Sequence, residues 1–376
     1  ARPAEKPDIL ELMNHALELG VPDFGLVDRV WLERHEPTLN NEIEWALWGR
    51  SAGVVNPYEV VYAFCESAVQ NGVQVRCSEE VVSIFRNFDR WVVVSTGTQY
   101  NARCVINAAG LFADQISQLA GIDCPSIFAR KGQEFLLDRK VGWVTQRVIF
   151  PLPSAQTKGV LVIPTVDHNT MIGPTAEVVQ DKYDLSTTAE GKDEVLSAAR
   201  RLVPSIQQET IIASFSGLRP VIESEDFHIK QDATGFINVL GIQSPGLTAA
   251  PAVALYVRNL LPLTLRKKFH YLPERKAIPR FRELDQDTRN SLISADADFG
   301  DVICRCEEVT KGEVKESIHR GARTLDGIKF RTRAQMGRCH GAFCTMKLMS
   351  IIHHQREVPY SSISKRGAGS ELAVSP

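Results

Sequence analysis

Apolar residues recur along this chain at helical and at strand-like spacings, with glycine and proline between the runs. Residues 1–20 carry a helical apolar pattern that Gly20 ends, and residues 57–71 form a second predicted helix between Pro57 and Gly72. Short strands, interrupted by helices, dominate after residue 72. We expect strands in 73–77, 91–97, 104–110, 133–138, 147–153, 159–166, 169–174, 211–220 and 236–241, and helices in 112–121, 190–204 and 247–261.

The order of these elements predicts more than one domain. Residues 81–90 are expected to connect the first two strands, with Asn87 and Asp89 as turn residues. Residues 263–300 are charged and contain several prolines, which predicts a linker, and a module with four cysteines begins near residue 301. A chain of 376 residues is long enough for two or three domains, each with a core of its own.

Composition and charge narrow the class of protein. With 44% hydrophobic and 23% charged residues, the chain is typical of globular proteins. Its net charge of −2 gives no electrostatic argument for nucleic-acid binding. No apolar run is long enough to span a bilayer and no signal-peptide pattern is seen, so we expect a cytoplasmic protein that could be peripheral at a membrane.

Four of the eight cysteines form one compact pattern, Cys304-Arg-Cys306 followed after 32 residues by Cys339-x4-Cys344. Two close pairs of cysteines can bind zinc or an iron–sulfur cluster. Zinc knuckles usually space each pair by two to four residues, whereas neighbouring thiolates in a C-x-C pair suit the bridged irons of a [2Fe-2S] cluster. Zinc, two disulfides and four free thiols remain alternatives.

The residues around these cysteines fit a cluster. Thr310 and Glu313 form a predicted capping box that opens a helix ending near Gly321. Cys344 lies near the start of another predicted helix, where the positive end of the dipole favours a thiolate. Positive charge around an anionic cluster would come from four arginines, which are Arg305, Arg331, Arg333 and Arg338.

Two small-residue turns and one arginine are further candidates. The NAAG turn of 107–110 follows a buried strand, and the GIQSPG turn of 241–246 places free backbone N–H groups at a helix start. A plain strand–helix turn, and a helix capped by Thr248, are the alternatives. Arg219, between an apolar strand and Pro220, could clamp a carboxylate with two hydrogen bonds or form an internal salt bridge with Asp226 or Glu223.

Residues 301–366 resemble the bacterioferritin-associated-ferredoxin-like [2Fe-2S] domain. The motifs that carry this resemblance are VICRCEEVTKGEV, GARTLDGIKFRTRAQMGRC and HGAFC. Copies of this domain are appended to anaerobic glycerol-3-phosphate dehydrogenases and related flavoproteins. The resemblance implies that Cys304, Cys306, Cys339 and Cys344 hold a [2Fe-2S] cluster.

Most of the remaining chain resembles the D-amino-acid-oxidase superfamily of FAD enzymes, nearest the glycerol-3-phosphate and 2-hydroxyglutarate dehydrogenases. The matching runs include CVINAAGLFADQI, RKGQEFLLD, FSGLRPV and GFINVLGIQSPGLTAAPA. The resemblance implies that Arg219 binds the anionic end of the substrate and that Gln133 lies near flavin or substrate. The residues implied to contact FAD are Val81, Ala109, Gly110, Gly241, Gln243, Ser244, Gly246, Leu247 and Thr248.

The two resemblances together imply a mixed α+β and α/β fold. A partial Rossmann-like FAD-binding domain and an antiparallel-sheet substrate domain would share residues 1–262, and a small helical [2Fe-2S] domain would follow. The substrate sheet would lie mainly in 126–235, the FAD-domain pieces in 72–125 and 236–262, the linker in 263–300 and the cluster domain in 301–376.

The sequence departs from the family in two places. No G-x-G-x-x-G fingerprint occurs, so we expect that an N-terminal segment is lacking and that this chain alone binds FAD weakly or not at all. Gly246 stands where glycerol-3-phosphate dehydrogenases have a lysine shortly before Leu247-Thr248. This second departure favours a carboxylate substrate over glycerol 3-phosphate.

We therefore predict an FAD-dependent dehydrogenase that oxidises a small anionic hydroxy acid or glycerol 3-phosphate and passes electrons through a [2Fe-2S] cluster. One alternative is an amino- or imino-acid oxidase or dehydrogenase of the same fold. Another is a non-catalytic iron–sulfur or zinc electron-transfer subunit that lacks its FAD half. The expected protein partner is a second flavin or electron-transfer subunit.

Overall fold

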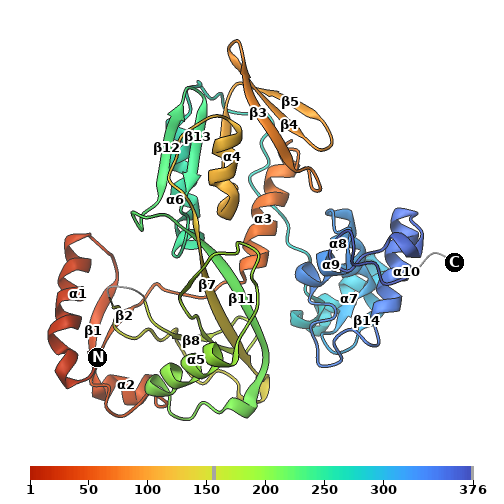
Figure 1. Ribbon diagram of the computed structural model, residues 1–376. Helices are drawn as coiled ribbons and strands as arrows, with labels where there is room; N and C mark the ends of the chain where they lie inside the picture. Colours follow the sequence, from red (N-terminus) through yellow and green to blue (C-terminus); the bar gives the residue numbers. More distant parts are fainter. Residues whose placement is uncertain (155–157, 374–376) are drawn as a thin grey trace. The chain divides into compact units, whose positions relative to one another are not determined.

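The computed structural model describes residues 1–154 and 158–373 of the chain (Figure 1). The described residues group into two compact units, one made of Ala1–Val55 and Cys77–Arg266 and the other of Asn56–Arg76 and Lys267–Pro376. Residues 56–76 thus join the C-terminal unit, whereas the sequence placed them in the 1–262 region. The finer boundaries proposed from the sequence, including the 263–300 linker, stay predictions.

The first unit combines antiparallel and parallel strands with helices, as predicted. Its strands are β1 (Phe24–Asp28), β2 (Trp45–Gly49), β3 (Val81–Asn87), β4 (Arg90–Ser95), β5 (Gln99–Ala102), β6 (Val105–Asn107), β7 (Phe128–Leu137), β8 (Leu161–Pro164), β9 (Thr170–Gly173), β10 (Glu177–Val179), β11 (Ile211–Val221), β12 (His228–Ala233) and β13 (Phe236–Leu240). Its helices are α1 (Lys6–Glu18), α2 (Arg29–His35), α4 (Ala113–Leu119), α5 (Ala189–Leu202) and α6 (Gly246–Leu260), with short 3-10 turns η1 (Pro3–Glu5), η2 (Gly110–Phe112), η3 (Arg139–Val141) and η4 (Gln208–Thr210).

The main antiparallel sheet lies within the predicted substrate region. Its order is β10-β7-β9-β8, and β11 also pairs with β7. Helix α5 begins after Thr188, whose hydroxyl accepts a hydrogen bond from the Gly191 N–H, and it buries Val195 and Leu196 against this sheet. The core so formed also contains Phe135 and other fully buried side chains of the sheet, including Leu137, Val162 and Ile172.

A second group of strands forms the remaining part of the first unit. Strands β6 and β13 run parallel, and β12 pairs with β13 from the other side. Strands β3, β4 and β5 form an antiparallel meander whose Trp91 packs edge-on against Phe236, with ring centroids 5.2 Å apart. Figure 1 shows α4 beside these strands.

Three strand predictions differ from the structure. Residues 73–77 form no strand, because all of their side chains are exposed and no neighbouring strand pairs with them in the described residues. The run 81–87, expected to be a connection, is instead strand β3, and the turn to β4 is only two residues long because Asn87 pairs with Arg90. Residues 147–153 contribute a single bridge, between Ile149 and Val162, rather than a strand.

The C-terminal unit is mainly helical. It contains α3 (Pro57–Gln70), α7 (Gln286–Ala295), α8 (Lys311–His319), α9 (Leu325–Thr332), α10 (Thr345–Arg356), the short strands β14 (Val302–Cys304) and β15 (Val309–Thr310), and the turns η5 (Phe281–Glu283), η6 (Ala297–Gly300) and η7 (Tyr360–Ser362). The capping box predicted for Thr310 and Glu313 is present. Ile328, Leu348 and Ile352 are fully buried in its core. Among the described residues, no helix is both long and apolar enough to cross a membrane.

Candidate functional site

The two turns proposed to hold a flavin follow the ends of neighbouring parallel strands. Asn107 of β6 lies opposite Asn238 of β13. Its Nδ2 donates to the Asn238 Oδ1 at 2.8 Å and to the Ala113 carbonyl at 2.7 Å, which ties the end of β6 to β13. Residues 108–110 and 241–246 begin directly beyond these ends. The carboxyl ends of parallel strands are where nucleotide cofactors bind in open α/β sheets.

A cavity of about 470 Å³ connects the two turns. Ala108 and Gly110 of the first turn and Gly246 of the second line it, together with the apolar side chains of Ile106, Val239 and Ile242. Gly110 has φ +58°, a backbone conformation that favours glycine, and an added Cβ would meet nothing within 4 Å. The small residues and open space fit close approach by a flat ring system or a dinucleotide.

Helix α6 starts without a side-chain cap. Pro245 is its N-cap residue, and Gly246 is its first residue. The alternative in which Thr248 caps the helix is therefore wrong, because Thr248 lies inside the first turn. Ser244, Leu247 and Thr248 are exposed there. The Gly246 N–H donates to the Gln243 carbonyl at 2.6 Å, so the N–H groups of Leu247 and Thr248 are those that could bind an anion or a carbonyl oxygen.

Of the remaining residues predicted to bind the cofactor, two lie in the turns and one lies away from the cavity. Ala109 directly precedes η2 in the first turn. Gln243, in the second turn, donates from Nε2 to the Glu225 carbonyl at 3.1 Å. Val81 starts β3 and packs against the core around Ile84 rather than lining the cavity. The structure thus brings the two turns together, and the FAD contact implied for Val81 stays a prediction.

Arg219 is half-buried near the end of β11. Its Nη2 donates to the Thr175 carbonyl at 2.7 Å. Neither Asp226 nor Glu223, the partners considered from sequence, forms an ion pair with it in the described part of the chain. Burial, and then the nearby Arg130 guanidinium, lower the pKa of Arg219. Arg219 is therefore a cation with unused donors, as an anion-binding role requires.

Gly132 provides the room for this guanidinium. A Cβ on Gly132 would lie 2.9 Å from Arg219 Nη2 and 2.8 Å from the Pro174 Cβ. Gly217 lies directly opposite Gly132 on β11, and a Cβ there would meet nothing within 4 Å. A side chain is therefore excluded at Gly132 but has room at Gly217, although the two glycines are paired across neighbouring strands.

Gln133 does not lie with Arg219. Successive side chains of a strand point to opposite faces, so Gln133 faces away from Gly132 and from the arginine above it. It is buried against α5, where its Oε1 accepts from the Thr188 N–H at 2.7 Å and its amide packs over Gly191. Its amide therefore holds the start of α5, and a contact of Gln133 with flavin or substrate stays a prediction.

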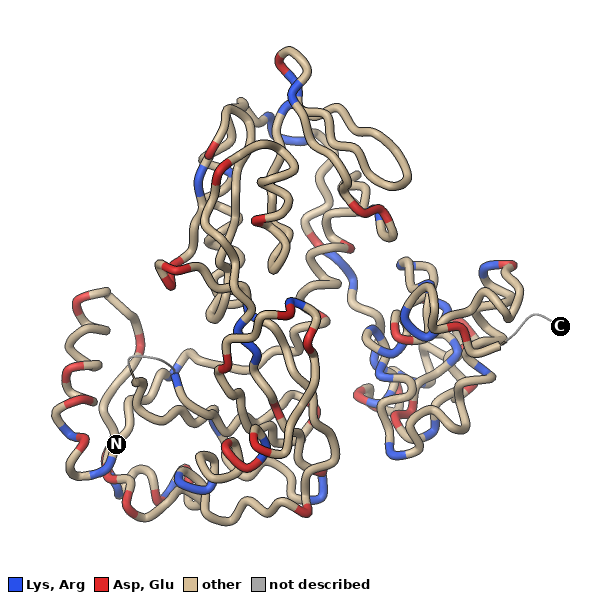
Figure 2. The backbone as a smooth tube through the Cα atoms, in the orientation of Figure 1, with Lys and Arg blue, Asp and Glu red and all other residues tan. Residues whose placement is uncertain are grey.

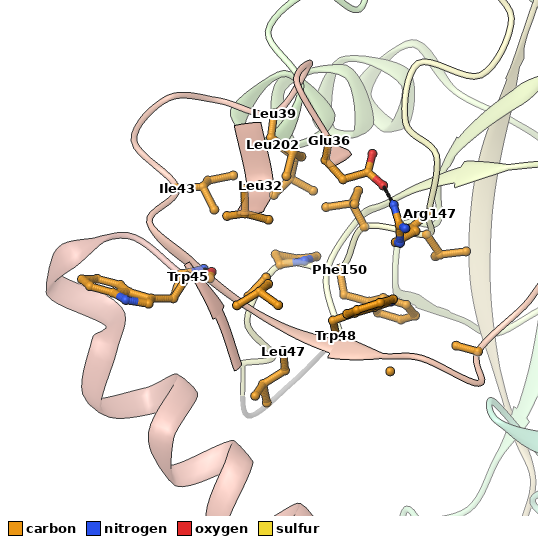
Figure 3. Close-up of a pocket in the computed structure, with 18 of the residues that line it drawn as sticks. Leu32, Glu36, Leu39, Ile43, Trp45, Leu47, Trp48, Arg147, Phe150 and Leu202 are labelled. Carbon is orange, nitrogen blue, oxygen red and sulfur yellow. Dashed lines mark hydrogen bonds and ion pairs between the residues drawn. The ribbon is translucent and has the colours of Figure 1, made fainter. Parts of the chain in front are cut away.

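A second cavity, of about 640 Å³, lies at the N-terminal hairpin (Figure 3). Its walls include Trp31 and Trp48. Its polar lining includes a buried Glu36, whose Oε1 accepts from Arg147 Nη1 at 2.9 Å. Arg147 also covers the Trp31 ring at 5.1 Å. Its lining contains none of the residues predicted to bind flavin or substrate, so we do not assign this cavity to the redox site.

The four predicted cluster cysteines are gathered in the C-terminal unit. Cys304 and Cys344 are buried in its core, whereas Cys306 is exposed and Cys339 partly exposed. The Sγ atoms of Cys306 and Cys339 are 3.3 Å apart, longer than the roughly 2.05 Å of a disulfide. Cys344 is the N-cap residue of α10, as expected from its place near a helix start.

This arrangement fits a binuclear cluster. The thiols lie as two neighbouring pairs, Cys306 with Cys339 and Cys304 with Cys344. In the described ranges no three Cys, His, Asp or Glu side chains are already placed around one point, so the choice between zinc and a cluster rests on the C-x-C spacing and the family model. Burial and the neighbouring Cys304 raise the pKa of Cys344 to about 12. Metal binding must therefore displace the thiol protons.

The surroundings of the cysteines differ in part from expectation. Glu307, directly after Cys306, is buried and accepts from Arg282 at 2.8 Å and from Arg333 at 2.9 Å. Arg331 lies over the Tyr62 ring, at 3.9 Å from its centroid, and so points toward α3. Figure 2 shows basic and acidic positions close together in this unit. The sequence did not identify Glu307, because nothing in the motif shows that two arginines fold back onto it.

Comparisons with known proteins identify a family for each of the two parts of the chain. The family model described as FAD dependent oxidoreductase matches residues 1–260, and the model described as BFD-like [2Fe-2S] binding domain matches residues 302–354.

Three relatives show the extent of the likeness. Among curated proteins, a glycerol 3-phosphate dehydrogenase of Caloramator mitchellensis is 40% identical over 97% of this chain and 78% of its own length. A subunit of the anaerobic glycerol-3-phosphate dehydrogenase of Escherichia coli (strain K12) is 25% identical over 80% of this chain and 62% of its own length. The solved structure of dithionite-reduced L-α-glycerophosphate oxidase from Mycoplasma pneumoniae with FAD bound matches with a TM-score of 0.64 and 27% identity, over 71% of this chain and 72% of that chain.

Proposed function

Because this chain belongs to the FAD-dependent oxidoreductase family, we propose that it oxidises glycerol 3-phosphate at its secondary alcohol and passes the electrons to a [2Fe-2S] cluster in its own C-terminal unit. The observation that carries the proposal is the half-buried Arg219 cation, which forms no ion pair with a carboxylate in the described chain. The substrate follows from the relatives, which are named for glycerol 3-phosphate. These names outweigh the inference of a carboxylate substrate that Gly246 suggested.

The residues of this chain would bind and orient rather than react. When bound, FAD accepts a hydride from the carbon that carries the hydroxyl. Arg219 would hold the anionic end of the substrate, so that this carbon is positioned against the ring held by the turns at Gly110 and Gly246. The exposed N–H groups at the start of α6 would stabilise negative charge on the cofactor.

The cluster would carry electrons one at a time to an acceptor. Cys306 and Cys339 are the more exposed ligands, so this side of the cluster would face that acceptor. The Escherichia coli relative is named as one subunit of its enzyme, which supports an electron-transfer protein as the partner of this chain.

Anaerobic mixing tests this proposal. The protein is supplied with excess FAD, because we expect this chain alone to bind FAD weakly. It is then mixed with glycerol 3-phosphate or with a 2-hydroxy acid such as 2-hydroxyglutarate, and the flavin and cluster absorbances are followed. We expect glycerol 3-phosphate to bleach the flavin band first and the cluster band afterwards. Bleaching by the 2-hydroxy acid alone would assign the enzyme to a carboxylate substrate instead.

Replacing Gly132 by alanine is expected to impair substrate binding. The added methyl group would collide with Arg219 and Pro174, so the guanidinium must move from its position over the strand. We expect KM for glycerol 3-phosphate to rise about tenfold in steady-state kinetics. Gly217→Ala, directly opposite on β11, is the matched control and should leave KM unchanged. Equal effects of the two substitutions would show that the space at Gly132 is not used by Arg219.

A further inference from the structure

A second arginine lies directly beside Arg219. In the antiparallel register of β7 and β11, Arg130 is the residue opposite Arg219. Directly opposite residues point to the same face of a sheet, so both guanidinium groups lie on the face that also carries Gly132. Like charges at such positions repel each other and destabilise a sheet unless an anion compensates them.

One exposed carboxylate compensates this pair of cations. Glu225 accepts from Arg130 with both oxygens, at 2.5 and 3.0 Å. Its side chain is 55% exposed, whereas that of Arg130 is 18% exposed. Arg219 instead donates to the backbone of Thr175. The carboxyl group of Glu134, which lies near Arg219, has its pKa raised by burial, so it is a weaker source of negative charge. The carboxylate that is ion-paired with Arg130 is thus well exposed to solvent.

The same carboxylate is linked to the turn that begins α6. Gln243 donates from Nε2 to a carboxylate oxygen of Glu225 at 3.3 Å, and its Oε1 is 3.5 Å from Arg130 Nη1. Glu225 lies in the loop between β11 and β12 with φ +59°, a conformation that costs free energy for a non-glycine residue. The side chain of Glu225 is thus held by Arg130 and Gln243, and its backbone N–H donates to the Ile222 carbonyl at 3.0 Å.

We propose that Arg130 and Arg219 together form a binding site for a doubly charged phosphate, and that Glu225 occupies Arg130 until the phosphate displaces it. This inference rests on the proposed oxidation of glycerol 3-phosphate and identifies the residue that selects its phosphate. A phosphate monoester carries about −1.5 to −2 charge at pH 7 and matches two guanidinium groups. A carboxylate carries one charge and needs Arg219 alone. Arg130 is therefore the specificity-determining residue.

Substituting Arg130 and Glu225 in turn distinguishes the proposed phosphate site from an ion pair that only supports the fold. Arg130→Gln removes a cation, whereas Glu225→Gln removes its competitor, and both break the same contact. If the pair only supports the fold, both variants weaken anion binding alike. If the proposal holds, Arg130→Gln weakens phosphate binding about 10- to 100-fold, and Glu225→Gln strengthens it several-fold.

The first measurement is calorimetric titration of the full chain with inorganic phosphate, which needs no turnover. The second is KM and kcat of the FAD-loaded enzyme for glycerol 3-phosphate and for glycerate. We expect Arg130→Gln to raise KM for glycerol 3-phosphate but not for glycerate, with little change in kcat, and Arg130→Lys to restore part of the affinity. Arg90→Gln, at an exposed position of β4, is the control.

The outcomes are distinct. Arg130→Gln could raise KM equally for glycerol 3-phosphate and glycerate, or Arg130→Gln and Glu225→Gln could change phosphate affinity in the same direction. Either result would overturn the role of Arg130 and leave the proposed oxidation intact. A wild-type enzyme that turns over only a 2-hydroxy acid would overturn the proposed substrate. In that case the phosphate titration still decides whether the arginine pair holds a dianion.

Discussion

Replacing Arg219 by glutamine is expected to lower kcat/KM for glycerol 3-phosphate by about a hundredfold or more. A charge-assisted contact to a partly buried anion contributes about 2–5 kcal/mol when one partner is truncated, and each 1.4 kcal/mol is tenfold. Arg219 is half-buried and its Nη2 is already fixed on the Thr175 carbonyl, so its remaining donors are preorganised for the substrate. Steady-state kinetics with glycerol 3-phosphate measure the loss.

Two controls distinguish lost binding from lost structure. Arg219→Lys keeps the charge without the two-pronged geometry and should recover only part of the activity. Arg86→Gln removes an arginine that also donates to backbone carbonyls, those of Thr234 and Phe88, and should leave kcat/KM unchanged. A glutamine variant of Arg219 with wild-type KM and kcat would exclude the residue from substrate binding.

Cys344→Ser is expected to abolish the iron–sulfur cluster and to destabilise the C-terminal unit. Cys344 is 1% exposed, next to Cys304, so no other thiol in the described chain can take its place without repacking the core. Because metal binding is coupled to folding, the loss of the cluster also removes its contribution to stability. Iron and sulfide analysis, visible absorption and the thermal unfolding midpoint measure these effects.

Cys65→Ser is the matched control for this experiment. Cys65 belongs to α3 in the same unit and is exposed, so its loss should leave iron content and visible spectrum unchanged. A Cys344→Ser protein that keeps the wild-type iron content would refute the ligand assignment. A colourless wild-type protein that contains zinc would instead support the single-ion alternative.

The cluster site could be predicted from sequence to a large extent, because its information is local. The spacing of Cys304 and Cys306, the capping box at Thr310 and the helix after Cys344 each depend on a few neighbouring residues, and all are present in the structure. The Glu307 contacts could not be predicted, since Arg282 and Arg333 approach it from distant positions.

The strands were also hard to predict, because each depends on a partner strand. Residues 73–77 alternate like a strand but remain exposed, whereas 81–87 form β3 because β4 is available to pair with them. A strand depends on hydrogen bonds and packing from a partner, and alternation in one segment does not identify that partner.

The sequence by itself determined the family, and it predicted the two turns, the four cysteines and Arg219 as site residues. Only the tertiary structure decided that Gln133 faces α5, that Gly132 makes room for Arg219 and that Arg130 lies beside it with Glu225 as counter-ion. The reason is physical: motifs and caps are set by short-range chain geometry, whereas the register of β7 against β11 determines which side chains share a face.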